Sequence, residues 1–165
     1  MAILRNYVTY GTPIVATITL TGLANGSGRT MVTIMNDTAT GLYTDYVGII
    51  TLRTTTGTHG ADKCCYAHLY GGTGTAYDYP GTNGDVALTI TGDTGLNTRG
   101  PFVINFGTSV TGLMSKTKVF FVGQAFGGNI PPQFGVIIEN QTGVLLDSTA
   151  ANHSVSFVPV YNYAT

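Results

Sequence analysis

Short runs of alternating apolar and polar residues recur about every 8 to 15 positions along this chain of 165 residues, separated by Gly- and Asn-rich turns. Alternation with a period of two places the side chains of a run on opposite faces of an extended strand. In residues 14–20, four apolar side chains at even positions alternate with Val15, Thr17 and Thr19. Repeated short strands of this kind are typical of an antiparallel sandwich or barrel.

The same pattern predicts nine or ten strands and no helix. The predicted strands cover residues 14–20, 30–35, 43–52, 64–70, 86–91, 102–106, 118–122, 134–139, 144–146 and 154–161. No exact internal repeat is present, which argues against a propeller or a solenoid. We therefore predict an all-β fold, an antiparallel two-sheet sandwich of the jelly-roll type, formed by residues 14–165 as one domain. Residues 1–13 are predicted to form an N-terminal arm or an edge strand.

Charge is scarce in this chain, and that excludes several classes of partner. Charged residues make up 9% of the sequence, against roughly 25% in an ordinary globular domain. The seven Lys and Arg are scattered, which argues against binding to nucleic acid or to an anionic membrane surface. No apolar run approaches a membrane span of roughly 20 residues, and no secretory signal opens the chain, so we expect synthesis in the cytoplasm.

The only two cysteines, Cys64 and Cys65, are adjacent. Neighbouring side chains of a strand point to opposite faces, so a disulfide between these two would be strained. We predict two reduced, partly buried thiols; an intermolecular bridge and a metal ligand are the alternatives.

Residues suited to catalysis are present, but not in a catalytic pattern. His59, His68 and His153 lie outside any nucleophile or zinc-protease motif. Glu139 and Asp147 could approach each other across a hairpin, as the carboxylates of a glycosidase do, although solvated turn carboxylates are the favoured interpretation. We predict that the protein is not an enzyme and has no cofactor.

A Gly-rich loop, residues 71–85, offers two kinds of binding residue. Asp78, Asn83 and Asp85 are oxygen ligands of the sort that calcium prefers, but Asx-type bonds to the local backbone are the favoured interpretation, and no metal site is predicted. Tyr77 and Tyr79 could stack on a sugar ring, yet exposed Tyr is as common in protein interfaces. For these two tyrosines, the sugar-binding and the protein-interface interpretations both remain open.

Four segments of the chain resemble a known class of protein. They are residues 35–46 (MNDTATGLYTDY), 126–143 (FGGNIPPQFGVIIENQTG), 145–147 and 155–161. Together they resemble small β-rich virion structural proteins of tailed bacteriophages, in particular capsid decoration (cement) proteins with jelly-roll or related sandwich folds. The resemblance extends over residues 30–160. It is a likeness of composition and of short sequence segments, so it assigns no functional residue to this chain.

The resemblance implies an architectural role on the outside of a capsid, with the major capsid protein as partner. It also implies a homotrimer, because decoration proteins meet capsid lattices at three-fold points. The candidate interface residues lie in the N-terminal arm, in the Gly-rich loop and in the Pro-Pro segment, where the prolines stiffen the chain: Tyr7, Tyr10, Tyr77, Tyr79, Ile130, Pro131 and Pro132.

The alternative function is a lectin-like or receptor-binding sandwich of a phage tail. Such a module would lose its affinity for a glycan when Tyr77, Asp78 or Tyr79 is changed.

Overall fold

The computed structural model describes residues 6–36, 43–60, 64–89, 97–107 and 113–164. These residues form eleven strands, one short α-helix and one 3-10 turn. In chain order the elements are β1 (Asn6–Tyr10), β2 (Ile14–Val15), β3 (Ser27–Thr30), β4 (Ile34–Met35), β5 (Asp45–Arg53), β6 (Cys64–Gly72), β7 (Ala87–Thr89), β8 (Arg99–Asn105), β9 (Ser115–Phe121), α1 (Val122–Ala125), β10 (Gln133–Gln141), η2 (Ala150–Asn152) and β11 (Ser154–Ala164). Residues 1–5 of the predicted arm and 90–91 of a predicted strand lie outside the described residues.

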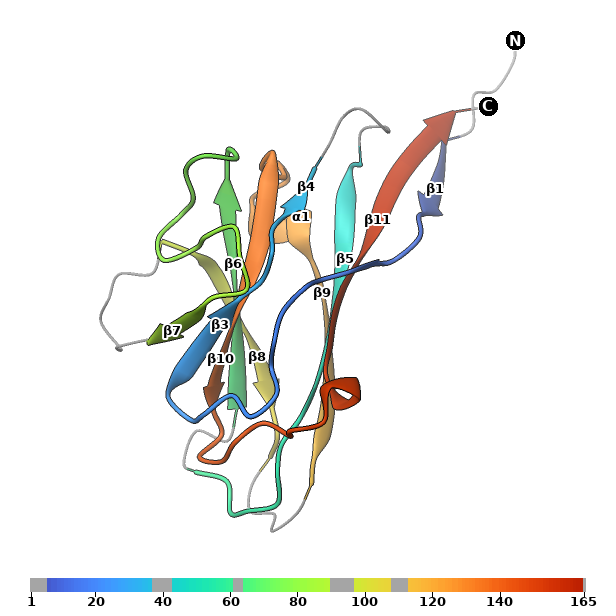
Figure 1. Cartoon of the computed structure of the whole chain (residues 1–165). Helices are drawn as coiled ribbons and strands as arrows, with labels where there is room; N and C mark the ends of the chain where they lie inside the picture. Colours follow the sequence, from blue (N-terminus) through green and yellow to red (C-terminus); the bar gives the residue numbers. More distant parts are fainter. Residues whose placement is uncertain (1–5, 37–42, 61–63, 90–96, 108–112, 165) are drawn as a thin grey trace.

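The strands form two antiparallel sheets packed face to face, which confirms the predicted sandwich (Figure 1). Sheet A has the order β1-β11-β5-β9, with β2 also paired to β11. Sheet B has the order β7-β3-β10-β6-β8, with β4 also paired to β10.

The pairing is nested along the chain. The first strands, β1 and β2, pair with the last, and β3 and β4 pair with β10. Inside these, β5 pairs with β9 and β6 pairs with β8. A long hairpin rolled up in this way is the jelly roll, and β7 is an additional edge strand of sheet B.

The core between the sheets follows from the period-two pattern. Along β5 the side chains alternate strictly between half-buried and buried, and its buried members Tyr46, Ile50 and Leu52 point toward sheet B. On sheet B, Phe134, Val136 and Ile138 of β10 and neighbouring residues of β6 pack in the same core. Burial of this apolar surface is the main favourable term for folding.

Sheet B is also buried on its other face, because residues 73–85 fold back over it. Tyr70 points away from the core, is fully buried, and donates its hydroxyl to the backbone oxygen of Thr82 at 2.7 Å. The Tyr70 ring lies against Gly81 and Gly135, where a Cβ atom would overlap it. Both β6 and β10 are therefore buried along almost their whole length.

Three predicted strands differ from the structure. Residues 30–35 are not one strand, because β3 ends at Thr30 and β4 covers only Ile34–Met35. Residues 14–20 keep the alternating burial, but only Ile14–Val15 pair as a strand, because the chain then crosses between the sheets. The amide of Ala16 donates to Val155, whereas the oxygen of Thr17 accepts from the amide of Val32. Residues 144–146 form no strand; Leu146 makes one isolated bridge to Thr54. The helix α1 and the turn η2 were not predicted.

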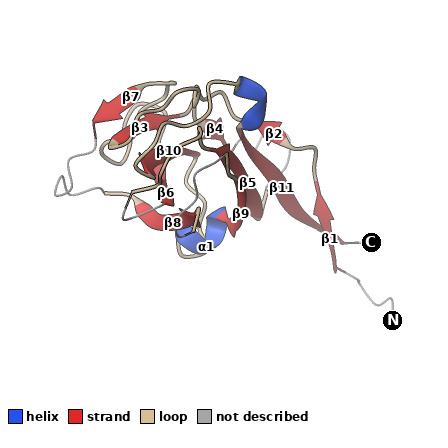
Figure 2. Ribbon diagram, turned by 90° about the horizontal axis from the view of Figure 1, so that it is seen from below, coloured by secondary structure: helices blue, strands red, loops and turns tan. Residues whose placement is uncertain are grey.

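The strand β11 is longer than the sandwich to which it belongs. Its residues 154–160 pair with β5, and its residues 160–164 pair with β1. Beyond the start of β5, β1 and β11 continue as a two-stranded ribbon that projects from the sandwich, away from sheet B (Figures 1 and 2). Residues 6–10 of the predicted arm thus form an edge strand of sheet A.

Both cysteines are free and buried, more deeply than predicted. Cys65 belongs to the core between the sheets, and its neighbour points to the opposite face of β6. Burial raises the pKa of the Cys65 thiol well above its usual value, so this group stays protonated and unreactive at neutral pH.

Candidate protein-interaction site

Two of the three histidines are engaged by the nearby backbone or a neighbouring hydroxyl. The Nε2 atom of His153 lies 2.8 Å from the backbone oxygen of Asp147, and its Nδ1 atom accepts from the amide of Arg53 at 3.4 Å. His59 is buried, and its Nε2 atom lies 3.1 Å from the hydroxyl of Thr54. Both rings are therefore held by contacts within the protein.

The third histidine, His68, is paired with Glu139 on the covered face of sheet B. The Nε2 atom of His68 lies 3.0 Å from a carboxylate oxygen of Glu139, and Gln141 donates to the other oxygen at 2.7 Å. The hydrogen bond from His68 outweighs the effect of burial and lowers the pKa of Glu139. Glu139 is 8% exposed, so this carboxylate is held ionised away from solvent.

Asp147, the other carboxylate considered for catalysis, has its own partners. It accepts from the amide of Thr149 at 2.7 Å and lies 3.5 Å from the guanidinium of Arg53. The backbone hydrogen bond from Thr149 is the main cause of its lowered pKa. A glycosidase acid needs a raised pKa, whereas Glu139 and Asp147 both have lowered ones.

Asp85, one of the three oxygen ligands considered for calcium, belongs to an ion-pair network. It accepts from the backbone and side chain of Thr19 and pairs with the guanidinium of Arg29. Partial burial works to raise its pKa, but these hydrogen bonds prevail and lower the pKa from 3.8 to about 2.

The other two members of that set point elsewhere. Asp78 accepts from the amide of Gly71 at 3.0 Å, and the side-chain oxygen of Asn83 accepts from the backbone and hydroxyl of Thr33. Within the described ranges, no three His, Cys, Asp or Glu side chains are grouped so that they could hold a metal ion. The bonds of Asn83 and Asp85 reach 50 residues or more along the chain, so the predicted local Asx bonding is wrong for both.

A groove lies where the Gly-rich loop meets the Pro-Pro segment. Its volume is about 370 Å³, and it is lined by Tyr77, Asp78, Asn129, Pro131 and Pro132 among others. The structure therefore brings together two sets of predicted interface residues that are more than 50 positions apart in the sequence.

The walls of this groove are held by bonds within the protein. The hydroxyl of Tyr77 donates to the side-chain oxygen of Gln133 at 2.6 Å, and its ring lies against Gly72, where a Cβ atom would overlap it. Pro131 packs on Gly71, whose amide is bound by Asp78. A groove built in this way is preorganised, which lowers the entropic cost of binding.

The remaining predicted interface residues divide into exposed and anchored ones. Tyr79 is 64% exposed beside the groove, and Tyr7 and Tyr10 are 41% and 61% exposed on the ribbon. Ile130 is only half-exposed and packs against the core, so it anchors its loop.

The end of β6 and the start of β10, which border the groove, lie at the same end of the sandwich as the ribbon (Figure 1). The amide of Asn36 donates to Pro132 in the groove, and the side chain of Asn36 accepts from the hydroxyl of Tyr46 at the start of β5. The start of β5 is also the point where the β1–β11 ribbon leaves the sandwich, at the pair Asp45 and Val160.

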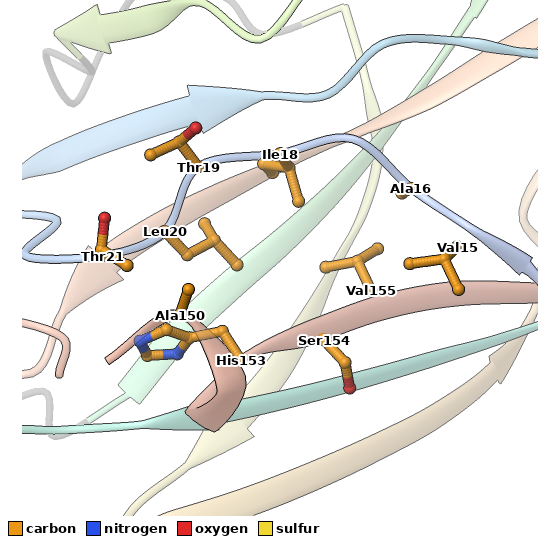
Figure 3. Close-up of a pocket in the computed structure, with 10 residues that line it drawn as sticks. All are labelled: Val15, Ala16, Ile18, Thr19, Leu20, Thr21, Ala150, His153, Ser154 and Val155. Carbon is orange, nitrogen blue, oxygen red and sulfur yellow. The ribbon is translucent and has the colours of Figure 1, made fainter. Parts of the chain in front are cut away.

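A second, smaller hollow was not predicted (Figure 3). It has a volume of about 220 Å³ and lies between residues 15–21 and residues 150–155. Ile18, Leu20 and Val155 make it mainly apolar, and His153 at its rim is already engaged. It is smaller than the roughly 300–1,000 Å³ typical of ligand pockets. Sequence reasoning could not find it, because the two segments that form it are far apart in the chain.

Comparison with protein-family models, with curated proteins and with solved structures finds no significant match for this chain. None of the helices in the described ranges has the length and apolar character needed to cross a membrane. The function is therefore argued from the geometry described above.

Proposed function

We propose that this protein is a non-enzymatic structural component of a tailed-phage virion, a decoration protein that cements the outside of the capsid. It is made in the host cytoplasm, assembles as a homotrimer and binds the major capsid protein. Jelly rolls occur both in viral capsid proteins and in lectins, so the fold is compatible with this role without requiring it.

The observation that carries the proposal is the gathering of exposed contact residues at one end of a rigid sandwich. Tyr7 and Tyr10 on the ribbon and Tyr79 beside the groove are exposed there, and Pro131 and Pro132 stiffen the loop between them. Exposed Tyr is enriched in protein interfaces, where it contributes a large contact area. A cement protein needs such an end to attach to a lattice.

Quantitative mass spectrometry of density-purified particles from the source tests the role directly. We expect hundreds of copies per particle, in constant ratio to the major capsid protein. A handful of copies would instead indicate a tail component, and absence from the particles would refute the virion role.

The contact end is tested by binding purified protein to particles that lack it. We expect Tyr7→Ser and Tyr79→Ser each to weaken binding by about tenfold, as loss of an interface Tyr commonly does. Leu145→Ser is the matched control, because Leu145 is 48% exposed and lies beyond the other end of β10. Equal binding by all three variants would contradict attachment through the groove end.

A second candidate function is carbohydrate binding, favoured by the composition of the groove. Its volume of about 370 Å³ suits a saccharide, and Thr73 and the exposed Asn129 present polar groups beside Tyr77. A glycan array with the unmodified protein tests it. Binding that is lost in Asn129→Ala but kept in Leu145→Ser would support this function over the capsid role.

A further inference from the structure

Sheet A carries an apolar surface on the side that faces away from sheet B. We call it the outer face and define it by Val15, Val47, Ile49, Val119, Phe121 and Val158. The strand register places these side chains in adjacent rows. Val47 lies between Phe121 and Val158, and the next row contains Val119, Ile49, Ser156 and Val15.

The outer face is unusual because the solvent side of a sandwich sheet is normally polar. Val15 is 74% exposed, Val119 is 55% exposed and Phe121 is 46% exposed. Isolated apolar residues on a surface need no explanation, but a contiguous exposed patch indicates an interaction surface.

The outer face continues onto the ribbon. Since Ser154, Ser156 and Val158 point outward, alternation along β11 places the buried Val160, which is 8% exposed, and the polar Asn162 on the same side. Their partners on β1 are Tyr10 and Val8, each 61% exposed. On the ribbon, the exposed apolar surface therefore consists of Tyr10 and Val8. A two-stranded ribbon is only marginally stable without a further layer.

We propose that a second copy of this chain packs on the outer face. This inference deepens the oligomer part of the proposed function, because it names the surface through which copies associate. Interfaces between copies in homo-oligomers are more apolar than transient interfaces with other proteins, which matches the row of Val, Ile and Phe.

The absence of charge in the middle of the outer face favours a copy over a different protein. The outward positions of β5 from Val47 to Thr51 carry no charge. At the ends of β5, Arg53 pairs with Asp147, and the side chain of Asp45 accepts a hydrogen bond from the amide of Gly123, which carries no compensating charge. Lys116 and Lys118 share the other side of β9 with Phe120. Two different proteins commonly use complementary charges, which speed their association and fix their relative position. A neutral face can pack against its own copy without electrostatic repulsion.

Hydroxyl groups line the end of the outer face that lies away from the ribbon. Thr51 and Thr117 are hydrogen-bonded to each other across β5 and β9 at 2.9 Å, and Ser154 lies in the same row. A hydroxyl both donates and accepts, so a row of hydroxyls is complementary to a copy of itself. A row of Lys or Asp would not be.

The outer face and the ribbon together approach the size of a specific interface. Strands spaced by about 4.8 Å with a rise of about 3.4 Å per residue give the paired parts of β5, β9, β11, β1 and β2 a flat footprint of roughly 600 Å². The relief of the side chains adds to that area. A stable interface buries about 800 Å² of accessible surface on each partner.

The test is the oligomeric state of the purified chain, measured by light scattering and sedimentation up to tens of micromolar. We expect an oligomer, and we expect Val119→Glu to weaken its association by at least about 30-fold, as a charge buried in an apolar contact does. Val103→Glu is the matched control: Val103 is 44% exposed, against 55% for Val119, and lies mid-strand on an edge strand of sheet B. Should Val119→Glu fail to fold, Val15→Thr keeps the shape of the side chain and tests the same face.

A dimer or a trimer that Val119→Glu dissociates and Val103→Glu leaves intact would establish this surface. A wild-type monomer throughout the concentration range, or an oligomer indifferent to Val119→Glu and Val15→Thr, would overturn the inference. Particle binding separates the two proposals: a monomeric wild-type chain that still decorates particles would refute the inference and leave the capsid role standing.

Discussion

Phe157→Ala is expected to lower the free energy of unfolding by about 4 kcal/mol. Phe157 is fully buried on β11 and contacts Phe120 of the same sheet and Phe134 of the opposite sheet. The ring centroids lie 6.3 Å and 5.2 Å away, both in edge-to-face orientation. Removing the ring leaves a cavity between the sheets and ends both contacts, and backbone held by two ladders cannot collapse into the space.

Urea denaturation followed by far-UV circular dichroism measures this loss, at a protein concentration low enough to keep the chain monomeric. Leu145→Ala is the control, since Leu145 is 48% exposed and its loss should change the free energy by less than about 0.5 kcal/mol. A change below about 1 kcal/mol for Phe157→Ala would show that the two sheets are not held together at this point.

The pattern of single strands could be predicted because it is local. Residues 16–20 alternate between apolar and polar side chains in the sequence, and the same residues alternate in burial, as β5 also does along its whole length. Turn residues separate the runs, and a period of two leaves only a sandwich or a barrel as a way to bury one face of each strand. The all-β class followed from this pattern, and the nested pairing of the jelly roll agrees with it.

The partners of those strands could not be predicted, because they are set by contacts far along the chain. Residues 16–20 have the pattern of a strand, but their backbone crosses from one sheet to the other. The side of β6 that carries His68 and Tyr70 has the pattern of a solvent face. It becomes buried only because residues 73–85 fold back over it and are fastened by Asp85 to Arg29.

The candidate site also depends on contacts between distant segments, which the sequence does not predict. Tyr77 and Pro131 were each predicted as contact residues from their loops, without any sign that they share one groove. Their meeting depends on the pairing of the end of β6 with the start of β10, which places Gly72 opposite Gln133. The outer face was missed because Val47, Ile49 and Val119 looked like core residues in a sequence rich in apolar strands.

The outer face and the groove are separate surfaces with separate proposed roles. The outer face is uncharged and borders the ribbon, whereas the groove lies between residues 71–78 and 126–132 at the end of the sandwich. A copy packed on the outer face would leave the groove and Tyr79 accessible. Association between copies and attachment to a capsid can therefore occur together.

Replacing His68 and Glu139 singly is expected to lower the free energy of unfolding by about 2 kcal/mol each at pH 7, because each change leaves a buried polar partner unsatisfied. His68 and Glu139 are 6% and 8% exposed, and their side chains are 3.0 Å apart. Once one partner is gone, removing the other costs less. A double-mutant cycle of His68→Ala and Glu139→Ala should give a coupling energy of about 1–3 kcal/mol.

The coupling should also depend on pH, in a direction set by the lowered pKa of Glu139. A carboxylate whose pKa is lower in the folded state than in the unfolded state stabilises the fold above the unfolded value, and this contribution is lost as the pH falls through the folded value. Stability measured from neutral pH downward should therefore fall below pH ~4.3 more steeply in the wild type than in Glu139→Gln, which cannot titrate there. Parallel pH curves for the two proteins, or additive single changes in the cycle, would mean that this buried pair is not an ion pair that supports sheet B.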